Sequence, residues 1–285
     1  MTHADENGFV SLFDGKTLDG WFTTPRTYGE LYPGGPTIME AHPGAFPANY
    51  NELAAQHPAV WTVEDGAIVG RQDTPGSGWG GYILTEKKYG DFELRFDANP
   101  DWPADTGIML RKARDTFHGF QVLLDHRKSG SIGGFYGNGI SGFHAVPFAL
   151  DVKTDANGTP IGLKEDDPAT SIEKFTQAKK DLLTEYCSAK EFLATWKFND
   201  WNAFRILFVG AKPKASVWIN DLLIASIDFA TMQYPNYNAD DVAEFLGPKG
   251  HIAFEVHDND HKGLGEGRWG RNAACRWRNI RIKEL

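Results

Sequence analysis

Apolar and polar residues alternate over several short stretches between Gly90 and Gly137, which is the spacing of half-buried β-strands. The stretches cover residues 91–97, 106–111 and 120–125. Because side chains alternate between the two faces of a strand, the apolar residues of the third stretch, Phe120, Val122 and Leu124, are expected to face a core. We therefore predict three consecutive antiparallel strands with one apolar and one polar face.

The polar face of these predicted strands carries Arg111, Gln121 and Asp125. A sheet with one apolar and one polar face is typical of an all-β sandwich, and its polar face can hold a sugar. The alternative interpretation is a solvated outer face, and it applies to each of the three residues taken singly.

Strand-like stretches run from Phe9 to Ile282 without a break in composition, which predicts a single domain over residues 1–285. Three segments interrupt the strand pattern and are interpreted as insertions, near 22–59, 143–198 and 230–246. Long ordered insertions either wall a binding cleft or pack at the periphery.

Two of these insertions are expected to be helical in part. Apolar residues at helical spacing follow Ser171, a good N-cap residue, and predict one or two amphipathic helices. Residues 240–246 predict one helical turn before a Gly-Pro pair.

The composition excludes several classes of function. The net charge of −9 is spread along the chain without a block of Lys or Arg, which disfavours nucleic acid as a partner. Nine tryptophans and thirty-one glycines fit a turn-rich β protein that stacks rings on sugars, or one with a tryptophan-rich core. Cys187 and Cys275 are too few and too far apart for a disulfide framework or a zinc site, and both are expected to be reduced.

The start of the chain has neither a basic region nor an apolar core, so no secretory signal and no membrane association are predicted. We expect a cytoplasmic protein, or a periplasmic one if a leader has been removed. Two glycine-rich stretches, 137–142 and 265–270, have the glycine spacing of a dinucleotide-binding motif, but neither precedes a predicted helix. No nucleotide or organic cofactor is therefore expected.

An ordered set of segments reaching both termini resembles the bacterial 3-keto-disaccharide hydrolase family. The segments are 9–21, 61–70, 89–95, 106–111, 200–202, 217–220 and 277–285. The resemblance implies a concanavalin/laminin-G-like jelly-roll β-sandwich with helical insertions, acting on glycosides already oxidised to a ketone at C3. A separate glycoside 3-oxidoreductase is then expected to supply the substrate.

Glu255 and His257 stand on alternate positions of a further predicted strand and so share a face. The family usually has Gln in place of Glu255 and His two residues later, so His257 matches the family and Glu255 departs from it. A carboxylate beside an imidazole predicts an acid–base pair, or two ligands of a divalent metal ion. Gln121 departs in the opposite sense, because the family often has an acid there. We hypothesise that a carboxylate has moved from one strand to its neighbour.

The implied substrate sets the expected chemistry. A ketone at C3 acidifies the C2 hydrogen, and the leaving group on C1 is β to the resulting carbanion. We predict that His257 removes this proton and that Arg111 binds the enolate, while Asp125 and Glu255 hold ring hydroxyls, a metal ion or the general-acid role.

Four further residues are predicted to contact the sugar. Trp79 or Tyr136 would stack on its ring, and Gln121 and His144 would bind its hydroxyls. His118, His126 and His144 are further candidates for the acid–base chemistry, and the favoured alternative for each is a surface histidine.

The predicted reaction is elimination by a 3-keto-glucoside 1,2-lyase, with hydration of the product as a following step. Direct hydrolysis of 3-keto-disaccharides and a non-catalytic carbohydrate-binding module stay open as alternatives.

Overall fold

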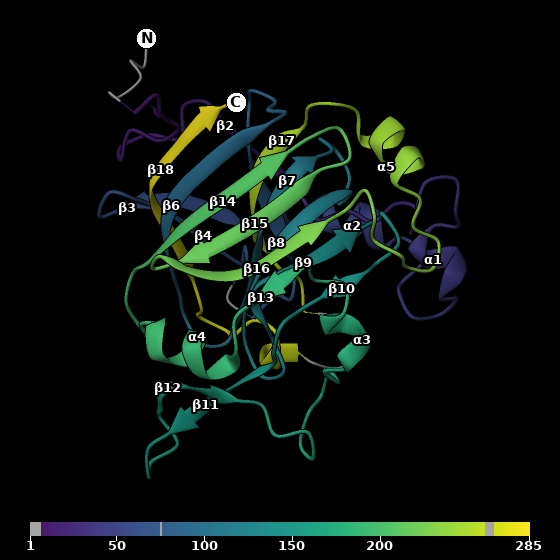
Figure 1. Cartoon of the computed structure of the whole chain (residues 1–285). Coiled ribbons are helices and arrows are strands. Elements are labelled where there is room, and N and C mark those ends of the chain that lie inside the picture. The colour runs from purple at the N-terminus through teal and green to yellow at the C-terminus, as the bar shows by residue number, and fades with distance from the viewer. Residues whose placement is uncertain (1–6, 75, 260–264) are drawn as a thin grey trace.

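The computed structural model describes residues 7–74, 76–259 and 265–285. Two antiparallel sheets pack face to face and carry the core between them (Figure 1). The first sheet has the order β13 (Glu185–Tyr186), β16 (Leu222–Asp228), β15 (Lys214–Ile219), β14 (Asn202–Val209), β6 (Phe92–Pro100), β18 (Cys275–Glu284), β4 (Ala67–Arg71) and β3 (Val60–Glu64), with β1 (Val10–Ser11) beside β18. The second sheet has the order β10 (His144–Ala145), β9 (Ile132–Asn138), β8 (Gly119–His126), β7 (Ala104–Lys112), β17 (His251–Val256), β5 (Gly81–Thr85) and β2 (Trp21–Pro25).

This jelly-roll sandwich confirms the all-β prediction, and the alternation of apolar residues explains its core. Phe96 and Phe204, on neighbouring strands of the first sheet, stack at 4.9 Å between ring centroids. Phe254 of the second sheet stacks on Trp277 of the first at 4.7 Å, which ties the two layers together. Phe120 points into this core, as predicted.

The pairing expected between residues 91 and 125 is wrong at its first strand. β6 pairs with β14 and β18 in the first sheet, whereas β7 and β8 pair with each other in the second. Alternation identifies a half-buried strand but does not identify its neighbours, since both sheets of a sandwich have the same pattern. The polar face is therefore formed by strands of the second sheet alone.

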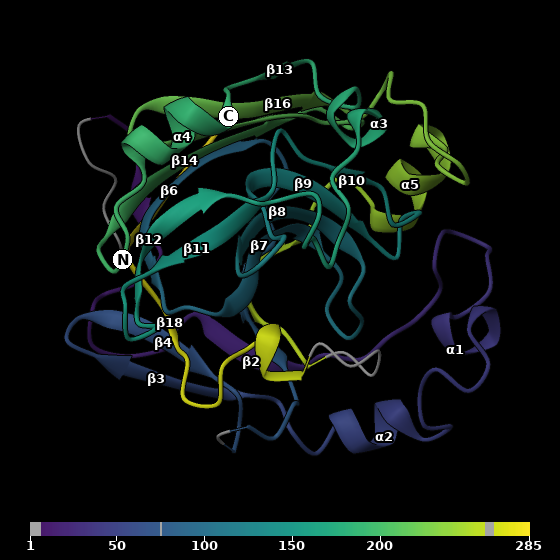
Figure 2. The same ribbon diagram turned by 90° about the horizontal axis from the view of Figure 1, so that it is seen from below.

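The first insertion, 22–59, begins within β2 and carries two short helices, α1 (Ile38–Ala41) and α2 (Tyr50–Ala54). Thr37 and Glu40 form a capping box at the start of α1. Figure 2 shows both helices on the side of the molecule away from β14 and β16. This insertion therefore lies on the side of the second sheet.

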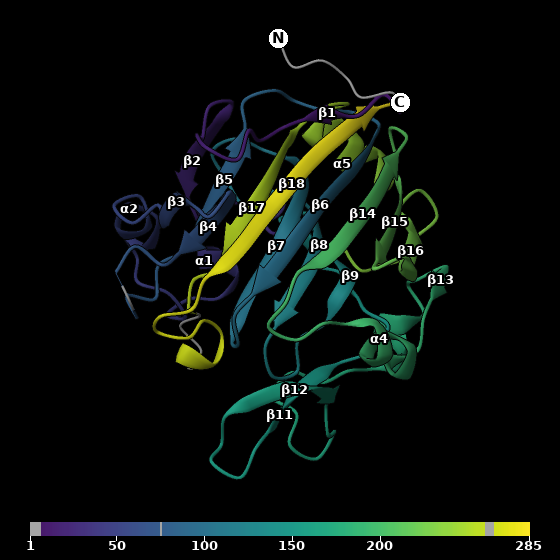
Figure 3. The ribbon, with the colours of Figure 1, turned by 90° about the vertical axis from the view of Figure 1, so that its left-hand side faces the viewer.

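The second insertion contains a hairpin that the sequence pattern did not predict, β11 (Leu150–Thr154) with β12 (Pro160–Glu165), which extends beyond one end of the sandwich (Figure 3). Its helices are α3 (Gln177–Lys180) and α4 (Ala189–Thr195), so the expected start at Ser171 is wrong. Thr176 and Ser188 are the N-caps, because their hydroxyls accept the backbone N–H groups of the first turns.

The third insertion contains α5 (Ala239–Leu246), which confirms the predicted helix. Asn238 caps its start, and Gly247 follows its end with a φ of 72°. A short 3₁₀-helix, η1 (Gly265–Gly267), forms the first part of the second glycine-rich stretch, 265–270. None of the helices in the described ranges has the length and apolar character needed to cross a membrane.

Candidate active site

A pocket of about 240 Å³ lies on the outer face of the second sheet, where β8 and β9 meet the first insertion. Five of the predicted site residues line it together: Gln121, Asp125, Tyr136, His144 and His257. Strand register explains their proximity, because Gln121 pairs with Tyr136, which in turn pairs with His144. Side chains at paired positions lie on the same face of a sheet.

Glu255 lies beneath this pocket and is fully buried. Its carboxylate accepts a hydrogen bond from Gln121 Nε2 at 2.6 Å, and Asn138 Nδ2 donates to Gln121 Oε1 at 2.7 Å. The two positions at which the chain departs from the family are thus in direct contact. The expectation that the two positions lie on neighbouring strands is wrong, because β7 separates β8 from β17, and the Gln121 side chain reaches Glu255 across Gly107 of β7. The exchange of a carboxylate between these two positions stays a prediction.

Arg111 is not at this pocket, contrary to its predicted role as the enolate-binding group. Its guanidinium donates to the carbonyl oxygens of Gly210 and Ala211, in the turn after β14 of the first sheet, and lies over the ring of Phe208. The register between β17 and β7 shifts between His251 and Ala253, and Arg111 has a φ of 51°. Such an irregularity changes the face to which the following side chains point, so the alternation does not extend to Arg111.

Trp79 also lies outside the residues that line the pocket. Its indole stacks on His57 at 5.5 Å and packs against Tyr50, which holds the first insertion in place. His118 and His126, expected at the surface, are both buried. His118 bonds the carbonyl oxygen of Glu30 and so attaches this insertion to β8.

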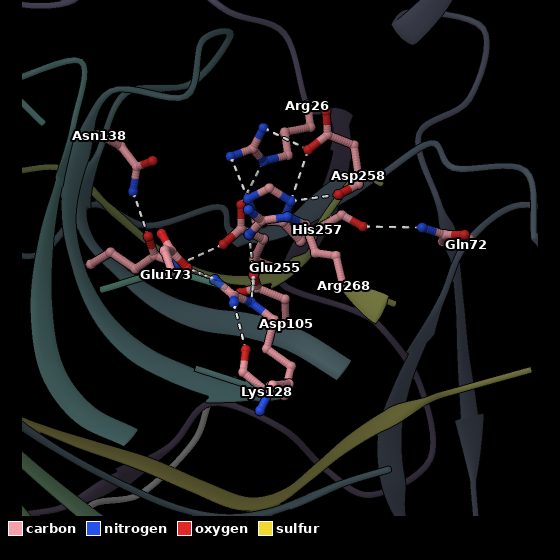
Figure 4. A network of polar contacts seen from close by, with 12 residues as sticks. Arg26, Gln72, Asp105, Lys128, Asn138, Glu173, Glu255, His257, Asp258 and Arg268 are labelled. Atoms are coloured by element: carbon pink, nitrogen blue, oxygen red, sulfur yellow. Dashed lines mark hydrogen bonds and ion pairs between the residues drawn. The ribbon is translucent and has the colours of Figure 1, made fainter. Parts of the chain in front are cut away.

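Arg26, in the first insertion, is the hub of the polar network beside the pocket (Figure 4). Its Nε lies 2.7 Å from Glu255 Oε1, and its Nη1 lies 2.9 Å from Asp258 Oδ1. Burial opposes the charge on both partners, but Asp258 holds the pKa of Arg26 above its usual value and Arg26 holds the pKa of Asp258 well below its own. This buried cation is therefore permanently charged and fixed in position.

His257 is held between Arg26 and Asp258 and is 13% exposed. Its Nδ1 lies 2.7 Å from the backbone oxygen of Asp258 and 2.8 Å from Oδ1 of the same residue. Two acceptors at Nδ1 place the proton there, which leaves the lone pair on Nε2. This lone pair accepts a hydrogen bond from Arg26 Nη2 at 3.0 Å.

Two carboxylates with opposite protonation lie at the other side of the pocket. Asp105 and Asp125 are directly paired across β7 and β8. Although burial opposes its charge, Arg127 and Arg268 hold the pKa of Asp105 well below its usual value. Burial, and then the charge of Asp105, raise the pKa of Asp125 well above its usual value. Asp125 is therefore a neutral acid, and its Oδ1 is buried without a hydrogen-bond partner among the described residues.

The second insertion contributes to the same wall of the pocket. Glu173 accepts a hydrogen bond from Arg127 Nη2 and lines the pocket beside His144. Burial lowers the pKa of His144 to about 4, so its imidazole is neutral at ordinary pH. Its Nε2 is buried and has no partner within the described part of the chain. The pocket thus offers a neutral imidazole and a neutral carboxyl group to a polar ligand.

The pair Glu255 and His257 does not fit the divalent metal ion considered for it. Both carboxylate oxygens of Glu255 already accept hydrogen bonds, and the Arg26 guanidinium lies between the two side chains. A cation at that position would meet a fixed positive charge. Nor do His, Cys, Asp and Glu gather into a metal-binding group of three anywhere in the described ranges.

Sequence patterns missed Arg26, Asp105, Arg127 and Arg268. Asp105 could have been predicted from the alternation, because it lies on the same face of β7 as Gly107 and Met109. Arg26 carries no such signal, since it follows β2 in a segment without periodicity. Its position is set by the packing of the first insertion on the second sheet.

A model of the 3-keto-alpha-glucoside-1,2-lyase-like domain matches residues 8–283, and the chain belongs to this family. Membership of this family makes it a carbohydrate-active protein. No protein of curated function matches the sequence.

Solved structures similar to this chain include two candidate glycosyl hydrolases from Parabacteroides distasonis ATCC 8503. The first has 15% sequence identity and a TM-score of 0.47, with 100% of this chain and 99% of that chain covered. The second has 16% identity and a TM-score of 0.45, with 79% and 90% covered. The carbohydrate-binding module CBM66 from Bacillus subtilis has 12% identity and a TM-score of 0.41, with 93% and 96% covered.

Proposed function

We propose that this protein cleaves 3-keto-glycosides by removing the proton on C2 and eliminating the substituent on C1. The observation that carries the proposal is a base beside a fixed cation at the pocket, with His257 Nε2 3.0 Å from Arg26 Nη2. In a 3-keto sugar the acidic hydrogen and the carbonyl oxygen are on adjacent carbons. A base for the first and a donor for the second must therefore lie side by side.

In the first step the substrate displaces the hydrogen bond from Arg26 Nη2 to His257 Nε2. The C2 proton then moves to this nitrogen, and the electrons of the C2–H bond form an enolate with its charge on O3. Nε2 suits this task, because the two oxygen atoms of Asp258 beside Nδ1 hold the proton on that other ring nitrogen. Arg26 stabilises the charge on O3 and takes the role that the sequence assigned to Arg111. Removing one such preorganised donor typically lowers kcat by about 10² to 10³.

In the second step the C3 carbonyl forms again, a C1–C2 double bond forms and the C1–O bond breaks. The departing oxygen takes its proton from Asp125, whose carboxyl group is kept neutral by burial and by Asp105. The products are a 2-hydroxy-3-keto-glycal and the free aglycone alcohol. Addition of water to the glycal would complete a net hydrolysis.

Tyr136 and His144 complete the sugar-binding part of the pocket. The ring hydroxyls would satisfy His144 Nε2 and Asp125 Oδ1, which have no partners among the described residues. No step above oxidises the sugar. A separate glycoside 3-oxidoreductase must therefore supply the ketone.

The test compares a 4-nitrophenyl 3-keto-glucoside with the same glucoside unoxidised, each with deuterium at C2. We expect release of 4-nitrophenol from the keto form alone, with loss of the label to solvent, because C2–H is too weak an acid without the ketone. The release is followed by absorbance and the label by mass spectrometry.

Cleavage of the keto form with the label retained would contradict elimination and favour direct hydrolysis. Cleavage of neither compound, together with tight binding of plain disaccharides in equilibrium dialysis, would favour a carbohydrate-binding module. The variant His257→Gln should lose turnover of the keto form while the chain remains folded.

A further inference from the structure

One wall of the pocket differs in chemistry from the polar part described above. Leu31, Ile38 and Phe46, all half-buried, line this side together with the buried ring of Phe117. Tyr28 joins the rings, with centroids 5.3 Å from Phe46 and 5.2 Å from Phe117. The first insertion thus adds an apolar surface opposite the hydrogen-bonding groups of β8 and β9.

This apolar wall has few polar atoms to offer to a ligand. The hydroxyl of Tyr28 already contacts Arg26 Nη1 and Asp258. A second hexose placed against this wall would bury hydroxyls without partners, at about 1–3 kcal/mol for each group. An aromatic or alkyl group there would instead be stabilised by the apolar area it removes from water.

The wall is held in a fixed position relative to the sugar-binding groups. Leu31 accepts a hydrogen bond through its backbone oxygen from Ser141 N at 2.8 Å, which ties it to the turn after β9. Asn51 accepts from Tyr28 N at 2.9 Å, and the Thr37 capping box fixes the start of α1. Such anchoring lets the wall discriminate between ligands, because a rigid apolar surface cannot turn polar groups toward a hydroxyl.

We propose that this wall is an aglycone subsite that selects 3-keto-glucosides of aromatic or alkyl alcohols over 3-keto-disaccharides. The inference rests on the proposed function. The oxidised sugar ring occupies the polar part, with C2 at His257 and the C1 oxygen toward Asp125. The substituent on C1 then extends onto Leu31, Ile38 and Phe46.

The experiment measures kcat/KM for phenyl and methyl 3-keto-glucosides and for a 3-keto-disaccharide. We expect the phenyl compound to exceed the disaccharide by tenfold or more. Because phenoxide is also the better leaving group, the contribution of the wall is measured by the fall of this ratio in the wall variants. In Leu31→Asn and Ile38→Asn, the ratio of kcat/KM for the phenyl compound to kcat/KM for the methyl compound, which does not reach the wall, should fall about tenfold, the scale of a lost apolar contact in a pocket. The control is Ile161→Asn, the same change at an exposed position of β12, 60% accessible and outside the pocket residues.

A disaccharide cleaved as fast as the phenyl compound, or variants that lower both glucosides equally, would overturn the subsite. If no 3-keto-glycoside is cleaved, the proposed function fails, and the subsite is judged by binding alone. Calorimetry with the same two glucosides should then give a tighter phenyl complex, and Leu31→Asn should remove the difference. Equal binding of both glucosides by the parent chain would end the inference.

Discussion

Asp105 and Asp125 have the same side chain on neighbouring strands, yet their surroundings give them opposite charge. Arg127 and Arg268 keep the first ionised, and the first keeps the second protonated. This division of two carboxylates is the usual way in which a protein keeps a neutral acid available near neutral pH.

Asp125→Asn should therefore lower kcat by about 10² to 10⁴ for a 3-keto-glucoside with an alkyl leaving group, the usual contribution of a general acid. It should have little effect on the 4-nitrophenyl compound, whose leaving group departs without a proton. Because the acid is active while protonated, the rate for the alkyl compound should fall as the pH rises through the raised pKa of Asp125. Equal losses for both leaving groups would indicate a structural role only.

His126 is a second titratable group whose behaviour is set by its surroundings. Its Nδ1 bonds the backbone oxygen of Asp101 at 2.8 Å, and the ring lies among Trp102, Trp196 and Phe198. Burial lowers the pKa of His126 to about 4. Protonation of His126 is therefore unfavourable in the folded protein, whereas in the unfolded chain this side chain is protonated below a pH of about 6.5.

The unfolding free energy should consequently fall as the pH drops from about 6.5 to 4, by roughly 3 kcal/mol for this one group. In His126→Phe this part of the pH dependence should be absent, because the phenyl ring does not titrate. Urea unfolding of both proteins at several pH values measures the difference. Parallel pH profiles for the two would contradict the assignment.

At the scale of elements, α4 shows how short helices of the insertions are held. Ser188 Oγ accepts from Glu191 N at 3.2 Å, and Glu191 Oε2 accepts from Ser188 N at 2.8 Å. Phe192 and Trp196 at its far end pack into the core. A seven-residue helix has little stability by itself, so the capping box and these two rings keep it folded.

Ser188→Ala should lower the unfolding free energy by about 1 kcal/mol, since it leaves backbone N–H groups of the first turn without an acceptor. Ser188→Asn keeps an acceptor at the cap and should retain most of the stability. Both are measured by urea titration. A similar loss in the two variants would mean that the hydroxyl has another role.

At the scale of the whole molecule, Cys187 and Cys275 report on the integrity of the sandwich. Both are free and buried, and both belong to the main hydrophobic cluster. Burial raises the pKa of Cys187 to about 11 and that of Cys275 well above its usual value. A protonated, inaccessible thiol is unreactive.

We therefore expect neither thiol to react with Ellman's reagent in the native protein, and both to react across the unfolding transition. The released thiolate, followed by absorbance against denaturant concentration, should coincide with the loss of the circular dichroism signal. A thiol that reacts well before this transition would reveal local opening of the core. Cys275→Ala separates the two signals.

The sequence alone determined the all-β class, the family and the polar face that carries Gln121 and Asp125. These follow from local alternation and from ordered segments, which fix what each strand buries whatever its neighbours are. It also indicated His257 with Glu255, because two positions on one strand share a face.

Only the tertiary structure decided which sheet each strand joins and which cation serves the site. Arg111 leaves the polar face at an irregularity of β7, and Arg26 enters from an insertion that has no periodicity. The protonation of Asp125 likewise depends on its burial and on the charge of Asp105, its partner on the neighbouring strand β7. Register, burial and electrostatic coupling arise between segments that are distant in the chain, so local sequence patterns do not predict them.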